Sequence, residues 1–239
     1  MTQTPEGTPL LERIERVRAR IRDAARRSNR SPEEIALVAV SKTHPVQAIQ
    51  EALAAGVTDF GENRVQEGET KIPAIRREKV KWHLIGHLQS NKARRAVELF
   101  DVIHSLDSAS LALRLDRVCE ESSRESLPVL VQVDLGHEAT KTGVDEGEIR
   151  EVVTAVQRCH RLQLIGLMTL PPFFEKSERV RPYLRRLRQL RDALQTNGAF
   201  GDRRGELSMG MTHDFEIAIE EGATIVRVGT AIFGERGRQ

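Results

Sequence analysis

A lysine follows directly on the first apolar segment of the chain. Lys42 comes after IALVAVS, a run whose β-branched and small apolar residues predict a buried strand. One interpretation is a side chain that extends to the rim of the fold and keeps its charge in water, because burying an ammonium group is costly. The other is an amine whose pKa is lowered by its surroundings and which forms an imine with an aldehyde. Position alone favours neither.

Hydroxyls and glycines gather where the last two apolar segments end. Ser208, Gly210 and Thr212 lie in ELSMGMT, and Gly229 and Thr230 lie in VRVGTAIFG. Loops of this kind form phosphate sites in β/α folds, since backbone N–H groups, hydroxyls and the N-terminus of a short helix all attract an anion. The alternative is that the glycines only form tight turns. Hydroxyls at both segment ends favour the phosphate site.

Arg227 lies within the last apolar segment, two residues before Gly229. An arginine that points inward from a strand needs an acceptor for its hydrogen bonds. If the segments close into a barrel, the first and last strands are neighbours, and Lys42 then lies beside the phosphate loops. An imine-forming amine next to a phosphate cradle indicates a site for pyridoxal phosphate.

The elements that must position these residues are read from the alternation of apolar and amphipathic segments. The predicted strands are Leu37–Ser41, Thr58–Gly61, Trp82–Ile85, Val102–Ser105, Val129–Asp134, Leu164–Thr169, Glu206–Met209 and Ile225–Val228. Strands that alternate with helical patterns predict a parallel sheet. Eight such units favour a single (β/α)8 barrel of the TIM type over an open doubly wound sheet, and in that barrel residues that bind ligands lie where strands end.

A further helix is expected before the first strand, at about Leu10–Ser28. Its apolar positions Leu11, Ile14, Val17 and Ile21 recur at three- and four-residue spacing, so we expect it to pack on the barrel. Residues 1–30 then form an N-terminal extension, and 1–239 form one domain. Within the barrel, Ser108 is predicted to cap the helix that follows it.

Composition argues against several classes of protein. The net charge is only +2 and aromatic residues make up 4% of the chain, so we expect no nucleic-acid partner. No apolar run is long enough to span a bilayer, and the beginning MTQTPEGTPL does not resemble a signal peptide. Cys119 and Cys159 form no close-spaced motif, which fits a reducing compartment. A cytoplasmic protein without a membrane partner is expected.

Rival motifs do not fit their own requirements. Gly229 to Gly234 has the spacing of a P-loop but is followed by Glu235 and Arg236 rather than Lys and Ser or Thr. His83 and His87 are four residues apart on a predicted strand, where that spacing covers about 13 Å and prevents shared zinc binding. His104 and His160 are predicted to be packing or surface residues, and His213 and Asp214 to be capping residues.

With these residues in view, the chain resembles the pyridoxal phosphate homeostasis protein family, the single-domain relatives of the alanine racemase barrel. The resemblance runs from about Ile35 to Arg236. It is carried, in this order, by AVSKTHPVQAIQEALAAG, DFGENRVQE, WHLIGHLQSNK, ATKTGV, GLMTL, LSMGMTHDF and VRVGTAIFGER. Several such segments in the right order are a specific signal, unlike any single motif.

The resemblance implies a role for each matched residue. Lys42 matches the lysine that holds the cofactor as a Schiff base, and Arg227 matches the arginine that faces the pyridine nitrogen. Ser208, Gly229 and Thr230 match the phosphate ligands. The full implied set is Lys42, Asn63, Met168, Ser208, Met209, Gly210, Arg227, Gly229 and Thr230, in which Asn63 and Met168 line the pocket and Met209 and Gly210 offer nearby N–H groups. Thr212 stands where the family more usually has serine, so the hydroxyl is kept.

The resemblance also implies what the protein does. A cation beside the pyridine nitrogen disfavours ring protonation and weakens the cofactor as an electron sink. Family members are regarded as carriers or regulators of the free cofactor pool, which implies a pyridoxal phosphate-binding protein in vitamin B6 and amino-acid homeostasis rather than an enzyme. The alternative is a pyridoxal phosphate-dependent amino-acid racemase. A phosphate-sugar enzyme would explain the phosphate loops but not Lys42 with Arg227.

Racemisation needs a second positioned base, which alanine racemases supply as a tyrosine of a second domain. Tyr183, the one tyrosine, lies on a predicted charged helix away from the strand ends. The resemblance therefore favours the binding protein, with no metal and with pyridoxal phosphate-dependent apo-enzymes as candidate recipients. Loss of the racemase dimer domain favours a monomer. The sequence does not fix the role of the segment His87–Arg94, which carries HLQSNKAR beside the expected site.

Overall fold

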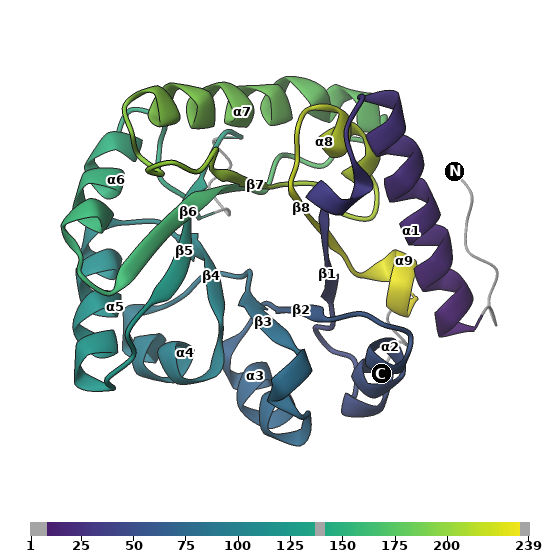
Figure 1. Cartoon of the computed structure of the whole chain (residues 1–239), viewed down its shortest axis with the longest axis horizontal. Coiled ribbons are helices and arrows are strands. Elements are labelled where there is room, and N and C mark those ends of the chain that lie inside the picture. Colours follow the sequence, from purple (N-terminus) through teal and green to yellow (C-terminus); the bar gives the residue numbers. More distant parts are fainter. Residues whose placement is uncertain (1–8, 137–141, 235–239) are drawn as a thin grey trace.

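Segments rich in β-branched and apolar residues form the strands of the computed structural model, which describes residues 9–136 and 142–234. The strands are β1 Ala36–Val40, β2 Asp59–Glu62, β3 Lys81–Leu84, β4 Val102–Leu106, β5 Leu127–Val133, β6 Leu162–Thr169, β7 Glu206–Ser208 and β8 Ile225–Val228. They run parallel and follow one another around a closed barrel, which Figure 1 shows end-on. The predicted (β/α)8 barrel is confirmed.

Closure of the barrel places the first strand beside the last. β1 pairs with β2 through Val38 and Asp59, and with β8 through Val38 and Arg227. Because all strands are parallel, their carboxyl ends meet at one end of the barrel. Lys42 after β1 and Gly229 after β8 therefore lie at the same end, as the sequence predicts.

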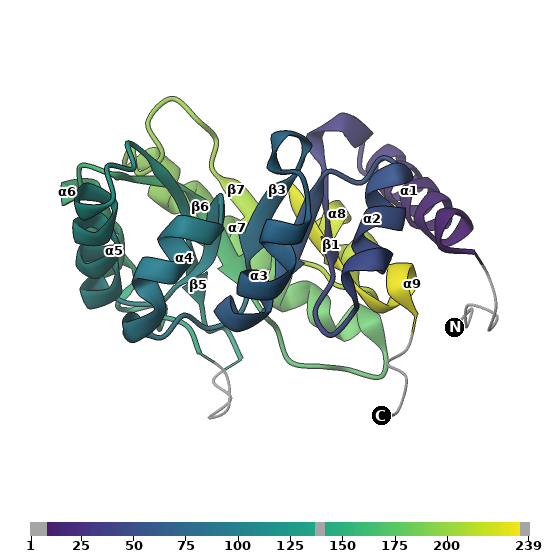
Figure 2. The ribbon, with the colours of Figure 1, turned by 90° about the horizontal axis from the view of Figure 1, so that it is seen from below.

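Helices cover the outside of the barrel. They are α1 Leu10–Arg27, α2 Val46–Ala54, α3 Val65–Lys71, α4 Ala93–Leu99, α5 Ala109–Glu121, α6 Ile149–Arg158, α7 Arg181–Thr196, α8 Phe215–Glu220 and α9 Thr230–Phe233. Both views place α1 beside α2 at one edge and α5 beside α6 at the opposite edge (Figures 1 and 2). Ser108 caps α5 by accepting a hydrogen bond from Leu111 N at 3.3 Å, as predicted. Among the described residues, no helix has the length and apolar character needed to cross a membrane.

The helix before the first strand packs on α8 and α9. Ile14, Val17 and Ile21 are buried there, and Arg20 donates a hydrogen bond to Glu216 of α8 at 2.8 Å. The expectation for Leu11 was wrong, because this residue is 56% exposed. Leu10, one helical turn before Ile14, packs against the core in its place. Residues 1–8 of the predicted extension lie outside the described residues.

The inside of the barrel is partly polar. Five strands contribute an interior apolar cluster, made of Val38, Val102, Leu130, Met168 and Ile225. The strands also carry the polar residues His83, His104, Ser208 and Arg227, all of which are buried. Burying polar groups is costly unless each one forms hydrogen bonds, so their partners bear directly on the site.

Candidate functional site

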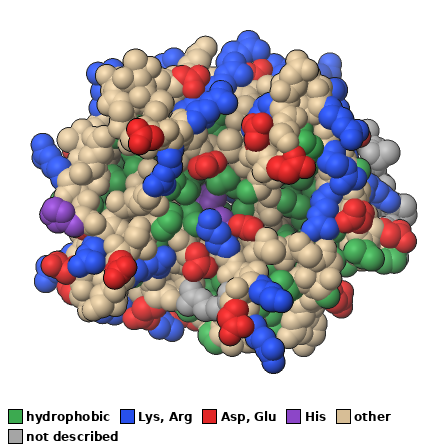
Figure 3. All heavy atoms as spheres, viewed as in Figure 1, with side chains coloured by type: hydrophobic (Ala, Val, Ile, Leu, Met, Phe, Trp, Pro, Cys, Tyr) green, Lys and Arg blue, Asp and Glu red, His purple; other side chains and the backbone are tan. Residues whose placement is uncertain are grey.

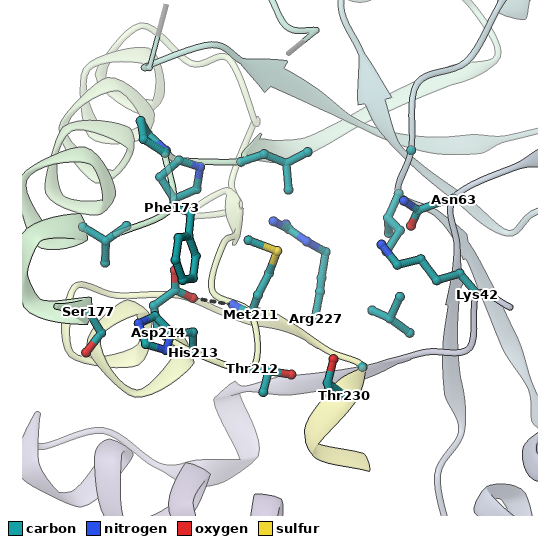
Figure 4. A pocket seen from close by; sticks show the side chains of 18 of the residues that line it. Lys42, Asn63, Phe173, Ser177, Met211, Thr212, His213, Asp214, Arg227 and Thr230 are labelled. Atoms are coloured by element: carbon teal, nitrogen blue, oxygen red, sulfur yellow. Dashed lines mark hydrogen bonds between the residues drawn. The ribbon is translucent and has the colours of Figure 1, made fainter. Parts of the chain in front are cut away.

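A cavity of about 580 Å³ opens where the strands end. Polar side chains from the loops after β1, β2, β7 and β8 line it on one side, and an apolar loop after β6 lines it on the other. Figure 4 shows Lys42 and Arg227 extending into the same space, with the hydroxyls of Thr212 and Thr230 nearby. The cavity therefore brings together an amine, a guanidinium and two hydroxyls.

Five of the nine predicted site residues line this cavity. They are Lys42, Asn63, Arg227, Gly229 and Thr230. The remaining four, Met168, Ser208, Met209 and Gly210, are buried and are not among its lining residues.

Each of those four has a clear local environment. Met168 belongs to the interior apolar cluster, and Ser208 hydrogen-bonds to other barrel residues. The N–H of Met209 donates to Ile225 O at 3.1 Å, and the carbonyl of Gly210 accepts from Arg227 N at 2.9 Å. Gly210 has φ +94°, and a Cβ there would meet Ala218 Cβ at 2.6 Å, so this tight turn requires glycine. Their place in cofactor binding stays a prediction.

The turn that carries Lys42 is held on both sides. Ser41 donates its hydroxyl to Glu62 Oε1 at 2.7 Å, and Thr43 donates its N–H to Glu67 Oε2 at 2.7 Å. Thr43 has φ +66°, a conformation that costs energy in a residue with a branched side chain. Glu67 therefore stabilises the strained residue next to Lys42. The Lys42 side chain is half-buried and points past Asn63 into the cavity (Figure 4).

A second lysine lies beneath this turn. The side chain of Lys71 is buried, and its Nζ donates to Ser41 O at 2.9 Å, to Glu62 Oε1 at 2.8 Å and to Glu67 Oε2 at 3.0 Å. Burial raises the pKa of Glu62, and Lys71 acts against this rise. Burial also acts to raise the pKa of Glu67, but hydrogen bonds from Thr43 N–H and Lys71 leave it lowered. We name Lys71, Glu62 and Glu67 the carboxylate–lysine cluster.

Arg227 is held inside the barrel by its neighbours. Its Nη1 donates to Ser208 O at 2.7 Å and to Ser208 Oγ at 2.5 Å, and its Nη2 donates to Thr169 O at 2.8 Å. Burial lowers the pKa of Arg227 to about 10, while the nearby Asp214 opposes this shift. Arg227 is therefore cationic at neutral pH. The prediction that a buried arginine here needs acceptors is confirmed.

The loops after β7 and β8 meet at the edge of the cavity. Thr212 Oγ1 accepts a hydrogen bond from Ala231 N, in the first turn of α9, at 3.3 Å. A Cβ on Gly229 would meet Val40 O at 3.3 Å, so the chain passes close to β1 at this point. Because the chain passes so close to β1, the Thr230 hydroxyl lies on the side of the cavity from which Lys42 extends (Figure 4). The two predicted phosphate loops are thus neighbours of the lysine.

The apolar wall and two polar residues were missed by sequence reasoning. Phe173 and Phe174 follow β6 and line the cavity, and His213 joins them by bonding Phe174 O through Nε2 at 3.0 Å. Asp214 also lines the cavity and accepts from Met211 N at 2.6 Å. His213 and Asp214 are more than the capping residues that were predicted. The run PPFF, which begins one residue beyond a predicted strand, was the available signal for the wall.

Geometry and chemistry together define a class of protein. The fold is a (β/α)8 barrel, and its cavity offers an amine for a carbonyl carbon and hydroxyls beside a short helix for a phosphate. The buried cation Arg227 also lines the cavity. These groups suit a small ligand that carries both an aldehyde and a phosphate, and the residues present therefore fit pyridoxal phosphate.

Comparisons with known proteins agree with this class. The sequence model of the family described as alanine racemase, N-terminal domain, matches residues 13–237. The pyridoxal phosphate homeostasis protein of Aquifex aeolicus (strain VF5) is 43% identical over 227 residues, which cover 94% of this chain and 97% of that protein. The chain therefore belongs to the alanine racemase N-terminal domain family and, within it, to the pyridoxal phosphate homeostasis proteins.

Solved structures agree as well. The structure of PipY from Synechococcus elongatus PCC7942 without PLP matches with a TM-score of 0.84 at 40% identity, covering 95% of this chain and 100% of that one. The structure of PipY with PLP bound matches with a TM-score of 0.82 at 39% identity and the same coverage. Alanine racemase from Corynebacterium glutamicum shares the fold with a TM-score of 0.65 at 20% identity, covering 95% of this chain and 62% of that one. The family resemblance is confirmed, although residues 139–141 of ATKTGV and residues 235–236 of VRVGTAIFGER lie outside the described residues.

Proposed function

We propose that this protein binds pyridoxal 5′-phosphate as a Schiff base on Lys42 and so takes part in vitamin B6 and amino-acid homeostasis. One observation carries the proposal. The side chain of Lys42 shares a single cavity with Arg227 and with the Thr212 and Thr230 hydroxyls. A relative of 39% identity has been solved with PLP bound, and the curated relative is named for pyridoxal phosphate homeostasis. Both support the same ligand in this chain.

Each residue takes a part that follows from its position. The amine of Lys42 binds the aldehyde carbon, and Thr212, Gly229 and Thr230 hold the phosphate at the start of α9. Arg227 faces the ring nitrogen, and Asn63 lies beside Lys42. Met168, Ser208, Met209 and Gly210 are buried and support these groups. Bound pyridoxal phosphate supplies a reactive aldehyde and an electron-withdrawing ring, and the Arg227 cation weakens the second property.

Removing one phosphate ligand tests the location of the binding site. Thr230→Val deletes a hydroxyl that faces a dianion, and such hydrogen bonds contribute roughly 1.5–3 kcal/mol. We expect the dissociation constant for pyridoxal phosphate, measured by absorbance titration, to rise about tenfold to a hundredfold. Thr154→Val, which makes the same change on the exposed face of α6, is the matched control and should bind like the unmodified protein. Equal affinity in the two variants would place the phosphate elsewhere.

A binding role is favoured over racemisation by the position of the one tyrosine. Tyr183 lies on α7 and packs against Phe174, with ring centroids 5.7 Å apart, and it is not among the residues lining the cavity. Racemisation takes a proton from one face of the substrate carbon and returns it to the other, so it needs two positioned groups. Lys42 supplies one of them. We therefore propose that the protein is not an enzyme, as the names of its relatives also suggest.

Amino-acid turnover is the direct test of that proposal. The loaded protein, incubated with L- or D-alanine in heavy water, should exchange the α-hydrogen far more slowly than the usual enzymatic rate of about 10 s⁻¹. NMR follows the exchange, a chiral assay follows racemisation, and the Lys42→Ala variant serves as the blank. Turnover near the enzymatic rate would overturn the proposal. His87, which also lines the cavity, would then be the first candidate for the second base.

Setting and partners remain part of the proposal. Cys119 and Cys159 are free thiols, which supports the expected reducing, cytoplasmic setting. We propose a monomer, with light scattering as its test. Pyridoxal phosphate-dependent apo-enzymes are the proposed recipients of the cofactor, and transfer from the loaded protein to a purified apo-enzyme is the measurement that addresses them.

A further inference from the structure

A continuous row of hydrogen bonds crosses the inside of the barrel. Arg227 Nη1 lies 2.5 Å from Ser208 Oγ, and Ser208 Oγ lies 2.8 Å from His104 Nδ1. His104 Nε2 lies 2.8 Å from His83 Nδ1, and His83 Nε2 lies 2.9 Å from Asp59 Oδ1. The five side chains come from β8, β7, β4, β3 and β2, and we name them the interior relay.

The relay joins the two ends of the barrel. Arg227 lines the cavity where the strands end, whereas Asp59 is the first residue of β2 and its side chain is 23% exposed. Figure 3 shows the face where the strands begin, with histidine atoms in a hollow near its middle beside Lys or Arg and Asp or Glu side chains. His83, His104 and Ser208 between them are buried. His104 is buried, as the packing alternative predicted, and it also forms hydrogen bonds with His83 and Ser208.

In the interior relay, the donors and acceptors allow the hydrogen bonds to run in only one direction. Burial acts to raise the pKa of Asp59, but hydrogen bonds from His83 and Thr58 leave it lowered, so its carboxylate only accepts. Burial lowers the pKa of both His83 and His104, so each ring is neutral and carries one N–H. The His83 N–H must lie on Nε2, facing Asp59, and its Nδ1 must accept.

The remaining hydrogens then follow in order. His104 must donate from Nε2 to His83, so its Nδ1 accepts a hydrogen bond from Ser208. The serine hydroxyl has a single hydrogen, which is used on His104, and its lone pair therefore faces Arg227. Arg227 can only donate, and this completes an arrangement in which every member finds the partner it needs. A reversed direction would require Asp59 to donate.

We propose that the interior relay is a positioning device for Arg227, and that His104, His83 and Asp59 are positioning residues of the cofactor site. By fixing the Ser208 hydroxyl, they hold Nη1 of Arg227 toward the barrel. The three hydrogen bonds to Ser208 and Thr169 use three of the five guanidinium N–H groups, which leaves two for the cavity. The effect on bound cofactor rests on the proposed function, in which Arg227 faces the ring nitrogen.

The free-energy cost of burying these polar side chains argues against the idea that they only fill the barrel interior. Polar side chains inside a barrel need complete hydrogen bonding, and apolar residues fill such interiors without that requirement. The cluster of Val38, Val102, Leu130, Met168 and Ile225 does so in this barrel. Two neutral histidines in a row are instead suited to transmitting one fixed orientation from Asp59 to Ser208.

Histidine NMR tests the relay without any cofactor. In the ¹⁵N-labelled apoprotein at neutral pH, His83 and His104 should both be neutral Nε2–H tautomers, with Nδ1 unprotonated. The variants His83→Gln and His104→Asn assign the two signals by their loss. An Nδ1–H tautomer or a doubly protonated ring at either position would overturn the relay. This result is independent of whether the protein binds pyridoxal phosphate.

The positioning role is tested in the loaded protein. His104→Leu removes the acceptor for Ser208, so we expect a shifted absorption maximum of the lysine-bound cofactor and roughly tenfold weaker binding. His104→Asn keeps an acceptor close to the Nδ1 position but loses the donor to His83, so it should restore only part of both properties. Leu130→Val, an interior change outside the relay, is the control and should retain the spectrum. Circular dichroism reports whether each variant is folded.

Two outcomes would decide against the role. A folded His104→Leu variant with the spectrum and affinity of the unmodified protein would overturn it. An absorption maximum that Leu130→Val shifts as far as His104→Leu does would also overturn it. If His104→Leu does not fold, Ser208→Ala carries the same test, because it removes the acceptor that faces Arg227. If the unmodified protein binds no pyridoxal phosphate, the proposed function fails while the NMR result still decides the relay.

Discussion

Borohydride added to the protein loaded with pyridoxal phosphate should fix the cofactor to one lysine, and the labelled peptide should contain Lys42. Hydride adds to the carbon of the imine and a proton adds to its nitrogen, which leaves a stable secondary amine that survives digestion. Mass spectrometry then locates the added pyridoxyl phosphate group. Lys42→Ala should abolish both the label and the absorbance of the bound imine, because no other lysine lines the cavity among the described residues.

Neighbouring lysines make this test selective. Lys71 lies beneath the same turn, but its Nζ bonds Glu62, Glu67 and Ser41 O, and its side chain is only 9% exposed. Lys92 lines a separate hollow next to the cavity. Lys92→Ala is therefore the matched control and should label like the unmodified protein. Label found on Lys71 or Lys92 would contradict the assignment of Lys42.

The strands could be predicted because their signal is local. β8 was predicted at Ile225–Val228 and has these bounds, because a turn before this apolar segment and a glycine after it mark both of its ends. The predicted strands at Val129 and Leu164 begin two residues too late. β5 and β6 start at Leu127 and Leu162, which pair with each other across the sheet. Pro128 argues against a strand locally, and the pairing outweighs it.

The site could be predicted only in part. That Lys42 and Thr230 line one cavity could be predicted, because strand ends meet at one end of a barrel and closure brings β1 next to β8. The contact of His104 with Ser208 joins residues 104 positions apart and depends on which way each side chain points from its strand. One sequence carries no signal for that pairing. For the carboxylate–lysine cluster, the sequence contained one signal, which is the four-residue spacing of Glu67 and Lys71 on a helix.

Loss of the buried ammonium should destabilise the fold more than any surface change. Lys71→Met leaves Glu62 and Glu67 without their shared cation, and breaking a buried ion pair by removing one partner costs about 3–5 kcal/mol. Urea denaturation of the apoprotein should show this loss in the free energy of unfolding. Lys92→Met, on the surface, is the control and should stay within about 0.5 kcal/mol. A loss of similar size in both variants would mean that the cluster does not stabilise the fold.

The pH dependence of that loss identifies the group responsible. Burial raises the pKa of Glu62 in the folded protein, and a raised pKa contributes stability at low pH that is lost as the pH rises through the folded pKa. Lys71 opposes this rise, so its removal moves the pKa of Glu62 further up and widens the pH range over which stability is lost. The difference between Lys71→Met and the unmodified protein should therefore be smaller at about pH 5 than at about pH 8. Lys71→Met combined with Glu62→Gln removes the titrating group and should flatten this dependence. A difference that instead grows toward low pH would show that Glu62 is not the carboxylate that depends on Lys71.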